Sequence, residues 1–164
     1  MTRLTIRRYP DVALKMRAEP VTDFGPELQR LADDLYEAMK AAPGIGITGP
    51  HCGILKRLTV IELPEIGGRR DYVNPDILWM SEELMTHTEG SVSMPGMTED
   101  VTRPRAIRVR YQTLDGAVME EELEGFAAIC MQHEIDQLNG IFWIQKLSRL
   151  KRERLLKKWE KAER

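Results

Sequence analysis

The chain has 164 residues, of which 42% are hydrophobic and 30% charged, and its formal net charge at pH 7 is −2. This composition is too apolar for a disordered chain, and the length suits one domain with its own core, so we expect residues 1–164 to form a single domain. The apolar runs are only a few residues long, which excludes a membrane span. The first eight residues lack the apolar block of a signal peptide, so we expect a cytoplasmic protein.

The first half of the chain contains one helix signal and two strand signals. Residues 1–20 contain Pro10 and Pro20 and are expected to be extended with turns. Residues 26–41 are predicted to be helical, because apolar side chains recur there at spacings of three and four, at Leu28, Leu31, Leu35 and Met39. The β-branched and aliphatic composition of Arg57–Leu63 predicts a strand. Asp71–Met80 is a second strand candidate, and the Asn74-Pro75 pair inside it favours an edge position.

A hairpin signal follows in the second half. Ala106–Thr113 alternates apolar and polar residues, as does Val118–Leu123, and Asp115-Gly116 between them is a typical turn pair. The apolar face of Gly125–Asn139 predicts a helix that ends at Asn139-Gly140. Helices and antiparallel strands in mixed order indicate an α+β fold.

The C-terminal region has a distinct charge. After Ile141–Ile144, a short apolar strand or turn, residues 148–162 are predicted to be helical with Ser148 as the N-cap. Residues 149–164 hold eight basic and three acidic residues, a net charge of +5, whereas the preceding 148 residues carry −7. A basic helix on an acidic body can bind a polyanion such as RNA, although a solvated helix face accounts for the same pattern.

Three segments contain residues that could carry chemistry. The glycines of Gly44–His51 (GIGITGPH) allow a backbone to approach a ligand closely, but no Gly-Lys-Ser/Thr follows, so this is not a phosphate-binding loop. The small residues of Glu89–Gly96 (EGSVSMPG) could expose backbone N–H groups to an oxyanion. Gln132–Gly140 (QHEIDQLNG) resembles a helical H-E-x-x-H metal motif in which an amide, Gln137, stands four residues after His133. Each segment alone is compatible with an ordinary loop or core helix.

Together and in this order, the three segments resemble the peptide deformylase family, whose motifs are G-φ-G-φ-A-A-x-Q, E-G-C-φ-S and Q-H-E-x-D-H. The likeness covers essentially the whole chain. It implies an α+β peptide-deformylase-like fold, in which antiparallel sheets pack around a central motif-bearing helix and a C-terminal helix follows. It also implies an activity, the hydrolysis of the formyl group from the N-formylmethionine of newly made polypeptides.

The resemblance assigns roles to residues that match the family's motifs. Glu134 matches the general acid/base, His133 matches one ligand of a ferrous iron or zinc ion, and the N–H of Val92 matches an oxyanion donor. Two further groups match positions along the substrate. Gly44, Ile45 and Gly46 match the edge along which the substrate backbone lies. Phe126, Ile129 and Cys130 match positions that line the methionine pocket.

Three positions depart from the family's motifs. Ser91 replaces the ligand cysteine, Gln137 replaces the second ligand histidine, and His51 replaces the oxyanion glutamine. Zinc and ferrous iron prefer thiolate, imidazole or carboxylate over a neutral hydroxyl or amide. We therefore expect no cofactor, or at most weakly bound Fe²⁺ or Zn²⁺. The expected function is that of a weak or inactive family member, and a peptide-binding pseudoenzyme is one form it could take.

Two alternatives keep an enzymatic role. In the first, His51, His133 and Glu134, or Glu89, form a rearranged metal site in an active deformylase or amide hydrolase. In the second, Ser91 is a nucleophile assisted by His133 and Glu134, and the Val92 N–H serves as the oxyanion donor. The resemblance also implies two partners, an N-terminal formylmethionyl peptide and, through the basic C-terminal helix, the ribosome. No membrane partner is expected.

Overall fold

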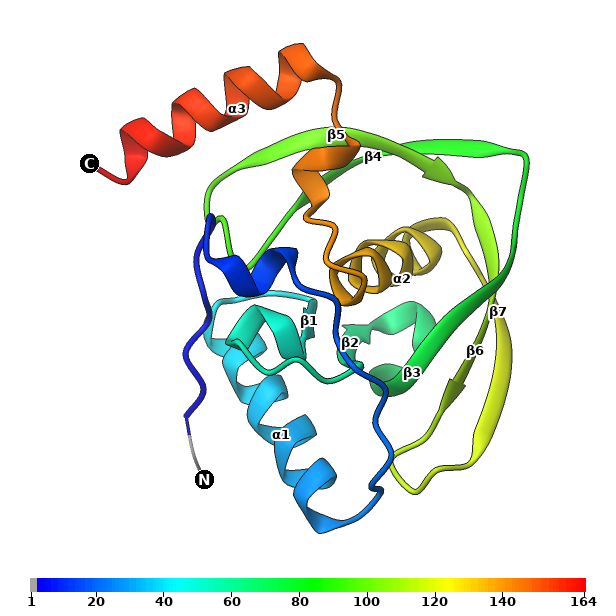
Figure 1. Ribbon diagram of the computed structural model, residues 1–164. Coiled ribbons are helices and arrows are strands. Elements are labelled where there is room, and N and C mark those ends of the chain that lie inside the picture. Colours follow the sequence, from blue (N-terminus) through cyan, green and yellow to red (C-terminus); the bar gives the residue numbers. More distant parts are fainter. Residues whose placement is uncertain (1–2) are drawn as a thin grey trace.

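Two antiparallel sheets and three helices build the fold of the computed structural model, which describes residues 3–164 (Figure 1). The larger sheet has the strand order β1-β2-β3-β6-β7, and the smaller one pairs β4 with β5. The strands are β1 (Gly46–Thr48), β2 (Leu58–Leu63), β3 (Gly68–Met80), β4 (Leu84–Gly90), β5 (Thr98–Pro104), β6 (Ala106–Gln112) and β7 (Val118–Glu124). The β6–β7 hairpin confirms the turn predicted at Asp115-Gly116, whereas the β4–β5 pair was not predicted.

Helix α2 (Gly125–Leu138) lies at the centre, with both sheets around it (Figure 1). It contacts β1, β2 and β4 to β7, and ten of its fourteen residues are buried. A helix buried on most of its circumference needs apolar residues on several faces, and Ala128, Met131 and Ile135 pack against the aliphatic side chains of the larger sheet. The expected α+β fold with a central motif-bearing helix is therefore confirmed.

Helix α1 (Pro26–Ala41) covers β1 and β2 with the apolar stripe that predicted it. Leu28, Leu35 and Met39 are buried in one cluster with Ile47 of β1 and Val60 of β2. The chain then turns back toward β1, because the Gly44 N–H donates to the Met39 carbonyl oxygen over 2.7 Å. This turn brings the glycine-rich segment to the edge of the larger sheet, next to α2.

Strand β3 lies inside the larger sheet, so the predicted edge position of Asp71–Met80 is wrong. It pairs with β2 on one side and β6 on the other. The pairing with β6 is shifted between Val73 and Asp76, and Asn74 there has a left-handed backbone with φ of 50°. Pro75 falls within this bulge, where its missing N–H leaves no ladder hydrogen bond unmade.

Helix α3 (Arg149–Ala162) begins where the sequence predicted, since the Ser148 hydroxyl accepts a hydrogen bond from the Lys151 N–H over 3.3 Å. Residues 141–144 form no strand but lead into a short 3-10 helix, Trp143–Lys146. Leu155 and Trp159 bury one face of α3, and the Trp159 Nε1–H donates to the Tyr9 carbonyl oxygen over 3.1 Å. None of the helices described in residues 3–164 is long and apolar enough to cross a membrane.

Candidate functional site

A cavity of about 480 Å³ lies between β1, α2 and the turn that follows β4. All three motif segments contribute to its wall. Of the twelve residues to which the resemblance assigns a role or a departure, the structure brings eleven to this cavity and leaves one, Gln137, outside its lining. The eleven are Gly44, Ile45, Gly46, His51, Ser91, Val92, Phe126, Ile129, Cys130, His133 and Glu134. Glu89, named in the rearranged-site alternative, also lines the cavity.

The apolar end of the cavity is formed by the first turns of α2. Phe126, Ile129 and Cys130 line it from this helix, and Ile45 lines it from the segment before β1. Burial raises the pKa of the Cys130 thiol strongly, and the nearby Glu134 carboxylate raises it further. Cys130 is therefore a neutral thiol that contributes apolar surface. Cys52 is also a free, buried cysteine, but it does not line the cavity.

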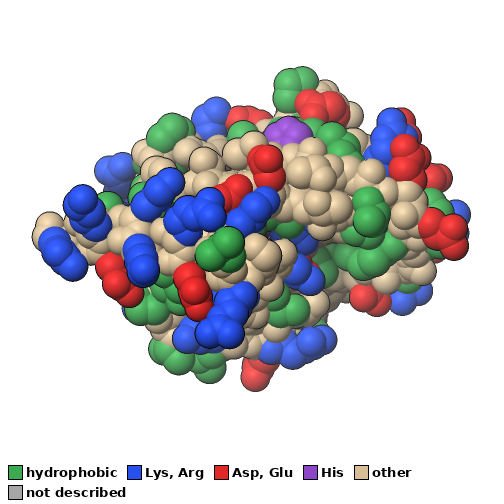
Figure 2. Space-filling view, turned by 90° about the horizontal axis from the view of Figure 1, so that it is seen from above, with side chains coloured by type: hydrophobic (Ala, Val, Ile, Leu, Met, Phe, Trp, Pro, Cys, Tyr) green, Lys and Arg blue, Asp and Glu red, His purple; other side chains and the backbone are tan. Residues whose placement is uncertain are grey.

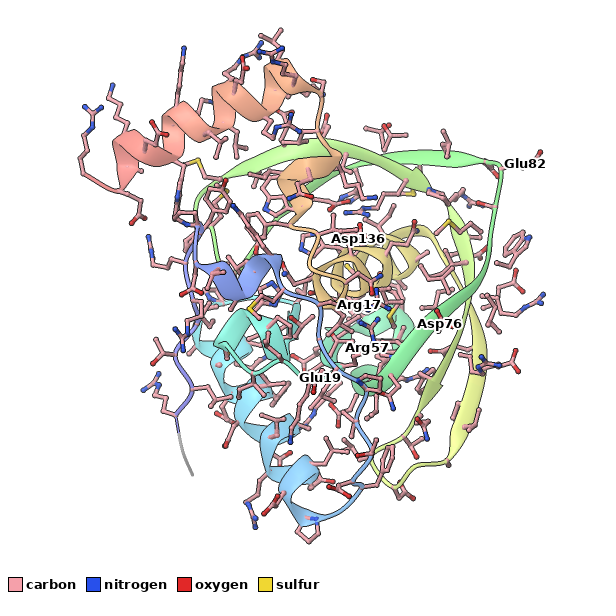
Figure 3. The ribbon with its side chains drawn as sticks, viewed as in Figure 1. Arg17, Glu19, Arg57, Asp76, Glu82 and Asp136 are labelled. Carbon is pink, nitrogen blue, oxygen red and sulfur yellow. The ribbon has the colours of Figure 1, made fainter. Side chains whose placement is uncertain are left out.

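His133 is held by a buried network of charged side chains. Its Nδ1 lies 2.8 Å from Glu89 Oε1, and Arg103 binds the same carboxylate through two nitrogens, with Nε at 2.6 Å and Nη2 at 3.0 Å. Arg103 Nη1 also donates to Asp136 Oδ2 over 2.7 Å, which ties the network to the C-terminal end of α2. Figure 3 labels Asp136 there. A carboxylate on Nδ1 fixes the orientation of the imidazole and leaves Nε2 for the cavity.

The charges of this network shift its pKa values in opposite directions. Burial alone would raise the pKa of Glu89, but His133 and Arg103 outweigh burial and lower it to about 2. Burial alone would lower the pKa of His133, but the carboxylates of Glu134 and Glu89 outweigh burial and raise it. Glu89 is therefore ionised at neutral pH, and it stabilises the protonated form of His133.

Glu134 projects from α2 against the backbone of β1. A Cβ atom at Gly46 would lie only 2.5 Å from Glu134 Oε2, so a glycine at this position makes room for the carboxylate. Glu134 Oε1 is buried and has no hydrogen-bond partner. Burial raises the pKa of Glu134 to about 7, although the charge of His133 opposes the rise. The side chain can therefore exchange a proton near neutral pH.

His51 presents a fixed hydrogen-bond donor to the cavity. Its Nδ1 accepts a hydrogen bond from the Thr48 N–H over 2.9 Å, and burial together with the charge of His133 lowers its pKa to about 3. A neutral imidazole that accepts at Nδ1 carries its proton on Nε2. His51 Nε2 is buried and has no partner, so His51 and Glu134 each bring one uncommitted polar atom to the same cavity.

The turn after β4 supplies Ser91 and Val92. The Ser91 hydroxyl accepts a hydrogen bond from the Ser93 N–H over 3.1 Å, and no hydrogen bond joins Ser91 to His133 in the part of the chain that the structure describes. The Val92 N–H donates to no acceptor within residues 3–164. The side chain of Val92 packs close to the glycine-rich segment, since a Cβ atom at Gly44 would lie 2.6 Å from Val92 Cγ1.

The donor atoms at the three ligand positions do not fit iron or zinc. Ser91 is a neutral hydroxyl engaged with the backbone, and the Gln137 amide nitrogen donates to the Leu14 carbonyl oxygen over 2.8 Å. Only His133 offers an atom that these metals prefer. While His51 Nδ1 accepts from Thr48, its Nε2 carries the proton and offers a metal no lone pair. Among residues 3–164, no three His, Cys, Asp or Glu side chains lie close enough together to hold a metal ion.

Two residues that position this site were not found from the sequence. Arg103 lies in β5, a strand that the apolar pattern did not reveal because its residues are mostly polar. Thr48 fixes the tautomer of His51 across a single turn of 3-10 helix. A Thr followed three residues later by a polar side chain is a helix-start signal, and it could have pointed to this contact.

Comparison with known proteins agrees with this geometry. The family model for polypeptide deformylase matches residues 3–153. A protein of Brucella melitensis biotype 1, named peptide deformylase-like, is 57% identical over 164 residues, which is all of both chains. A protein of the same name from Rhizobium meliloti is 58% identical over 159 residues, covering 97% of this chain and 92% of that one. The crystal structure of peptide deformylase from Ehrlichia chaffeensis in complex with actinonin is also similar, with 34% identity, a TM-score of 0.93 and coverage of 100% and 99%.

The fold is that of the peptide deformylases. The chain belongs to the polypeptide deformylase family. It is a divergent, peptide deformylase-like member, because Ser91, Gln137 and His51 depart from the family's motifs.

Proposed function

We propose that this protein binds the acylated N-terminus of a peptide and has lost most or all of the family's metal-dependent hydrolysis. The observation that carries the proposal is the combination of an open cavity with two neutral side chains, Ser91 and Gln137, at ligand positions. Because a water with no metal keeps a pKa near ~16 instead of ~7, it is a poor nucleophile. A general base such as Glu134 supplies about 10²–10⁴-fold by itself, so formyl release is slow or absent.

The uncommitted polar atoms of the cavity match an uncharged acyl amide. A formyl oxygen accepts hydrogen bonds from the His51 Nε2–H and the Val92 N–H, and Glu134 Oε1 accepts from the amide N–H. The apolar end at Phe126 and Ile129 takes the methionine side chain. The peptide backbone continues along Gly44–Gly46. Such a peptide originates where polypeptides are made, in keeping with a cytoplasmic protein of protein biosynthesis.

Calorimetric titration with formyl-Met-Ala-Ser and with Met-Ala-Ser tests the binding. We expect the formylated peptide to bind more tightly by roughly tenfold or more, because a free ammonium group cannot accept from His51 or Val92. His51→Ala should weaken binding of the formylated peptide by roughly fivefold to tenfold. His51→Gln keeps a hydrogen-bond donor and should not weaken it. Equal affinity of the two peptides would contradict the proposal. Cys52→Ala, next to His51 but outside the cavity lining, is the control.

Metal content and turnover test the loss of hydrolysis. We expect the anaerobically purified protein to hold far less than one equivalent of iron, zinc or nickel and to release little formate from formyl-Met-Ala-Ser. The double change Ser91→Cys and Gln137→His should restore metal binding, since the Glu89–His133 contact that orients the remaining imidazole is intact. The control variant combines Ser91→Cys with Gln145→His. It has the same composition but leaves the third ligand position unfilled, so it should not restore metal binding. Stoichiometric metal with rapid turnover in the unchanged protein would overturn the proposal.

A second candidate function would use the same two uncommitted atoms. His51, His133 and Glu134 could form the rearranged site of an active deformylase or amide hydrolase, once His51 exchanges its Nε2 proton and its contact with Thr48. This reading requires bound metal that disappears in His51→Ala. The serine-nucleophile alternative requires that an active-site serine probe labels Ser91 and that Ser91→Ala abolishes the labelling.

We also propose that α3 directs the protein to the ribosome. Figure 2 shows Lys and Arg side chains gathered over one end of the molecule, on the side where α3 lies in Figure 1. Arg154, Lys157, Lys158 and Lys161 are exposed and form no ion pair with another residue of the described chain. Deletion of α3 would also remove Leu155 and Trp159 from the core, so charge substitutions are the appropriate test.

A further inference from the structure

A second cavity, of about 250 Å³, lies apart from the candidate site. Its wall includes Arg17, Arg57 and the bulged part of β3, where Asn74, Pro75 and Asp76 follow one another (Figure 3). The Asn74 side chain is fully engaged. Its oxygen accepts from the Val21 N–H, and its nitrogen donates to the Val21 carbonyl oxygen and to Gln112. The bulge thus forms a rigid wall, and the two arginines are the positively charged groups of the lining.

Arg57 is buried without a carboxylate partner. Only 9% of its surface is exposed, and no carboxylate oxygen within residues 3–164 lies within 4.0 Å of it. Two other arginines of this protein, Arg69 and Arg103, each bind a carboxylate through Nε and Nη2. A buried guanidinium without a counter-charge is unusual, because charged groups in protein interiors are almost always paired.

The hydrogen bonds of Arg57 leave one edge of the guanidinium free. Nη1 donates to the carbonyl oxygens of Leu138, at 3.0 Å, and Ala18, at 3.4 Å, and Nη2 donates to Asn139 Oδ1 at 2.9 Å. An arginine has five N–H donors, so the Nε–H and one Nη2–H remain. Nε and Nη2 are the two nitrogens with which Arg69 and Arg103 bind carboxylates. Arg57 lines the second cavity, and its Nε is not among the fully buried unpartnered atoms of the described chain.

We propose that this second cavity binds a small free oxyanion, a phosphate or a carboxylate, on the open edge of Arg57. Two oxygens of one anion match the Nε–H and Nη2–H geometry, and such two-pronged contacts are the strong ones for arginine. Arg17, which is exposed and lacks an ion pair within residues 3–164, supplies a second positive charge at the mouth of the cavity. Asp76 on the opposite wall opposes the anion, so the lining has a net charge of +1.

The electrostatics of Arg57 agree with this assignment. Burial and the charge of Arg17 lower the pKa of Arg57, and the attraction of Asp76 is the smallest of the three influences. An anion on the free edge would offset both of the unfavourable influences. The inference concerns a site separate from the peptide cavity and stands whether or not the proposed function is correct.

Titration of the full chain with inorganic phosphate, and separately with acetate, tests the proposal. Sodium chloride keeps the ionic strength constant, and amide chemical shifts report the position of binding. We expect saturable shifts at Ala18, Arg57 and Asp76, with no saturable shifts at Gly46 in the peptide cavity. Saturation by phosphate alone identifies a phosphate site, and saturation by acetate identifies a carboxylate site. Neither anion saturating these amides would overturn the proposal.

Three variants with opposite expectations make the test specific. Arg17→Gln removes a positive charge from the lining and should weaken anion binding by roughly threefold to fivefold. Asp76→Asn removes a negative charge and should strengthen anion binding by roughly threefold. Arg30→Gln removes the same charge as Arg17→Gln from an exposed position on α1 and should change nothing. Both Arg17 and Asp76 are exposed, so neither variant threatens folding. Equal affinities in Arg17→Gln and Arg30→Gln would show that only overall charge matters, and this would refute the site.

Discussion

Replacement of Arg103 by methionine is the sharpest test of the network that holds His133. Arg103 makes three short contacts, two with Glu89 and one with Asp136, and the side chains of Arg103 and Glu89 are only 5% and 4% exposed. Methionine has a similar length and no charge. Arg103→Met therefore removes the contacts with little loss of packing, but it leaves the Glu89 carboxylate buried with His133 as its remaining partner.

The loss in the free energy of unfolding expected for Arg103→Met can be obtained in two ways. Removal of one partner from a buried ion pair costs about 3–5 kcal/mol, because the other charge stays buried. Independently, His133 and Arg103 together lower the pKa of Glu89 from 4.5 to about 2, and that difference corresponds to roughly 3 kcal/mol. His133 contributes part of the energy obtained from the pKa difference. We therefore expect Arg103→Met to reduce the free energy of unfolding by about 3 kcal/mol.

Urea denaturation at pH 7 of the unchanged protein, Arg103→Met, Glu89→Gln and the double variant forms a double-mutant cycle. The double variant should be less destabilised than the sum of the single variants by at least about 1 kcal/mol, because it leaves no unpaired charge at position 89. Arg105→Met is the matched control. Arg105 lies two residues further along, and its contact with Glu83 is long, at 3.9 Å, and exposed, so the control should lose less than about 1 kcal/mol. A loss in Arg103→Met no larger than that of the control would refute the reasoning.

Three other predictions concern pH, a glycine and the basic helix. Because Glu89 has a lowered pKa in the folded state, its stabilisation is present above about pH 4.5 and is lost as the pH falls toward 2, and acid unfolding should shift to higher pH in Arg103→Met. Gly46→Ala should push Glu134 into the cavity, destabilise the protein by about 1–3 kcal/mol and weaken formyl-peptide binding, as measured by urea denaturation and calorimetry. Gly25→Ala, with no atom within 4 Å of its Cβ, changes only the N-cap of α1 and should leave peptide binding unchanged. Ribosome co-sedimentation should weaken as salt is added, and the slope of log binding constant against log salt concentration should fall in magnitude by about 2 in a triple variant of α3. A triple variant elsewhere should keep the original slope. An unchanged slope in the α3 variant would exclude this helix as the ribosome-binding element. The α3 variant changes Lys157, Lys158 and Lys161 to Gln, and the other changes Lys15, Arg30 and Lys56 to Gln.

Most of the fold was predictable because its signals are local. The stripe of α1, the turn pair of the β6–β7 hairpin and the Ser148 cap each depend on residues within one or two turns of one another. The β4–β5 pair could not be predicted in this way. Its strands are polar and largely exposed, and Thr86 and Thr88 pair with Thr102 and Asp100 across it instead of building an alternating apolar face.

The edge assignment of β3 failed for a physical reason. A proline inside a strand was expected to face solvent, but here a left-handed Asn74 and a shift in register move Pro75 out of the hydrogen-bonded ladder. The partners of the Asn74 side chain that help to hold that bulge in place, Val21 and Gln112, are long-range contacts. They lie 53 and 38 residues from Asn74, beyond the reach of any local pattern.

The candidate site also combines features that local sequence patterns predict with features that depend on long-range contacts. Glycine-rich, small-residue and helical motifs located eleven of its wall residues by their order along the chain. The tautomer of His51, the uncommitted oxygen of Glu134 and the role of Arg103 depend on distances between segments. Sequence motifs indicate which residues share a site, whereas hydrogen-bond geometry determines what each of them can donate or accept.

The contact between Trp159 and Tyr9 joins the two ends of the chain in one structure. The core cluster that it completes also contains Met94, which lines the cavity of the candidate site. During synthesis, the N-terminal segment emerges first and lacks this partner until nearly every other residue has been translated. The cluster around Met94, which is part of the cavity wall, is therefore completed only after α3 has been synthesised.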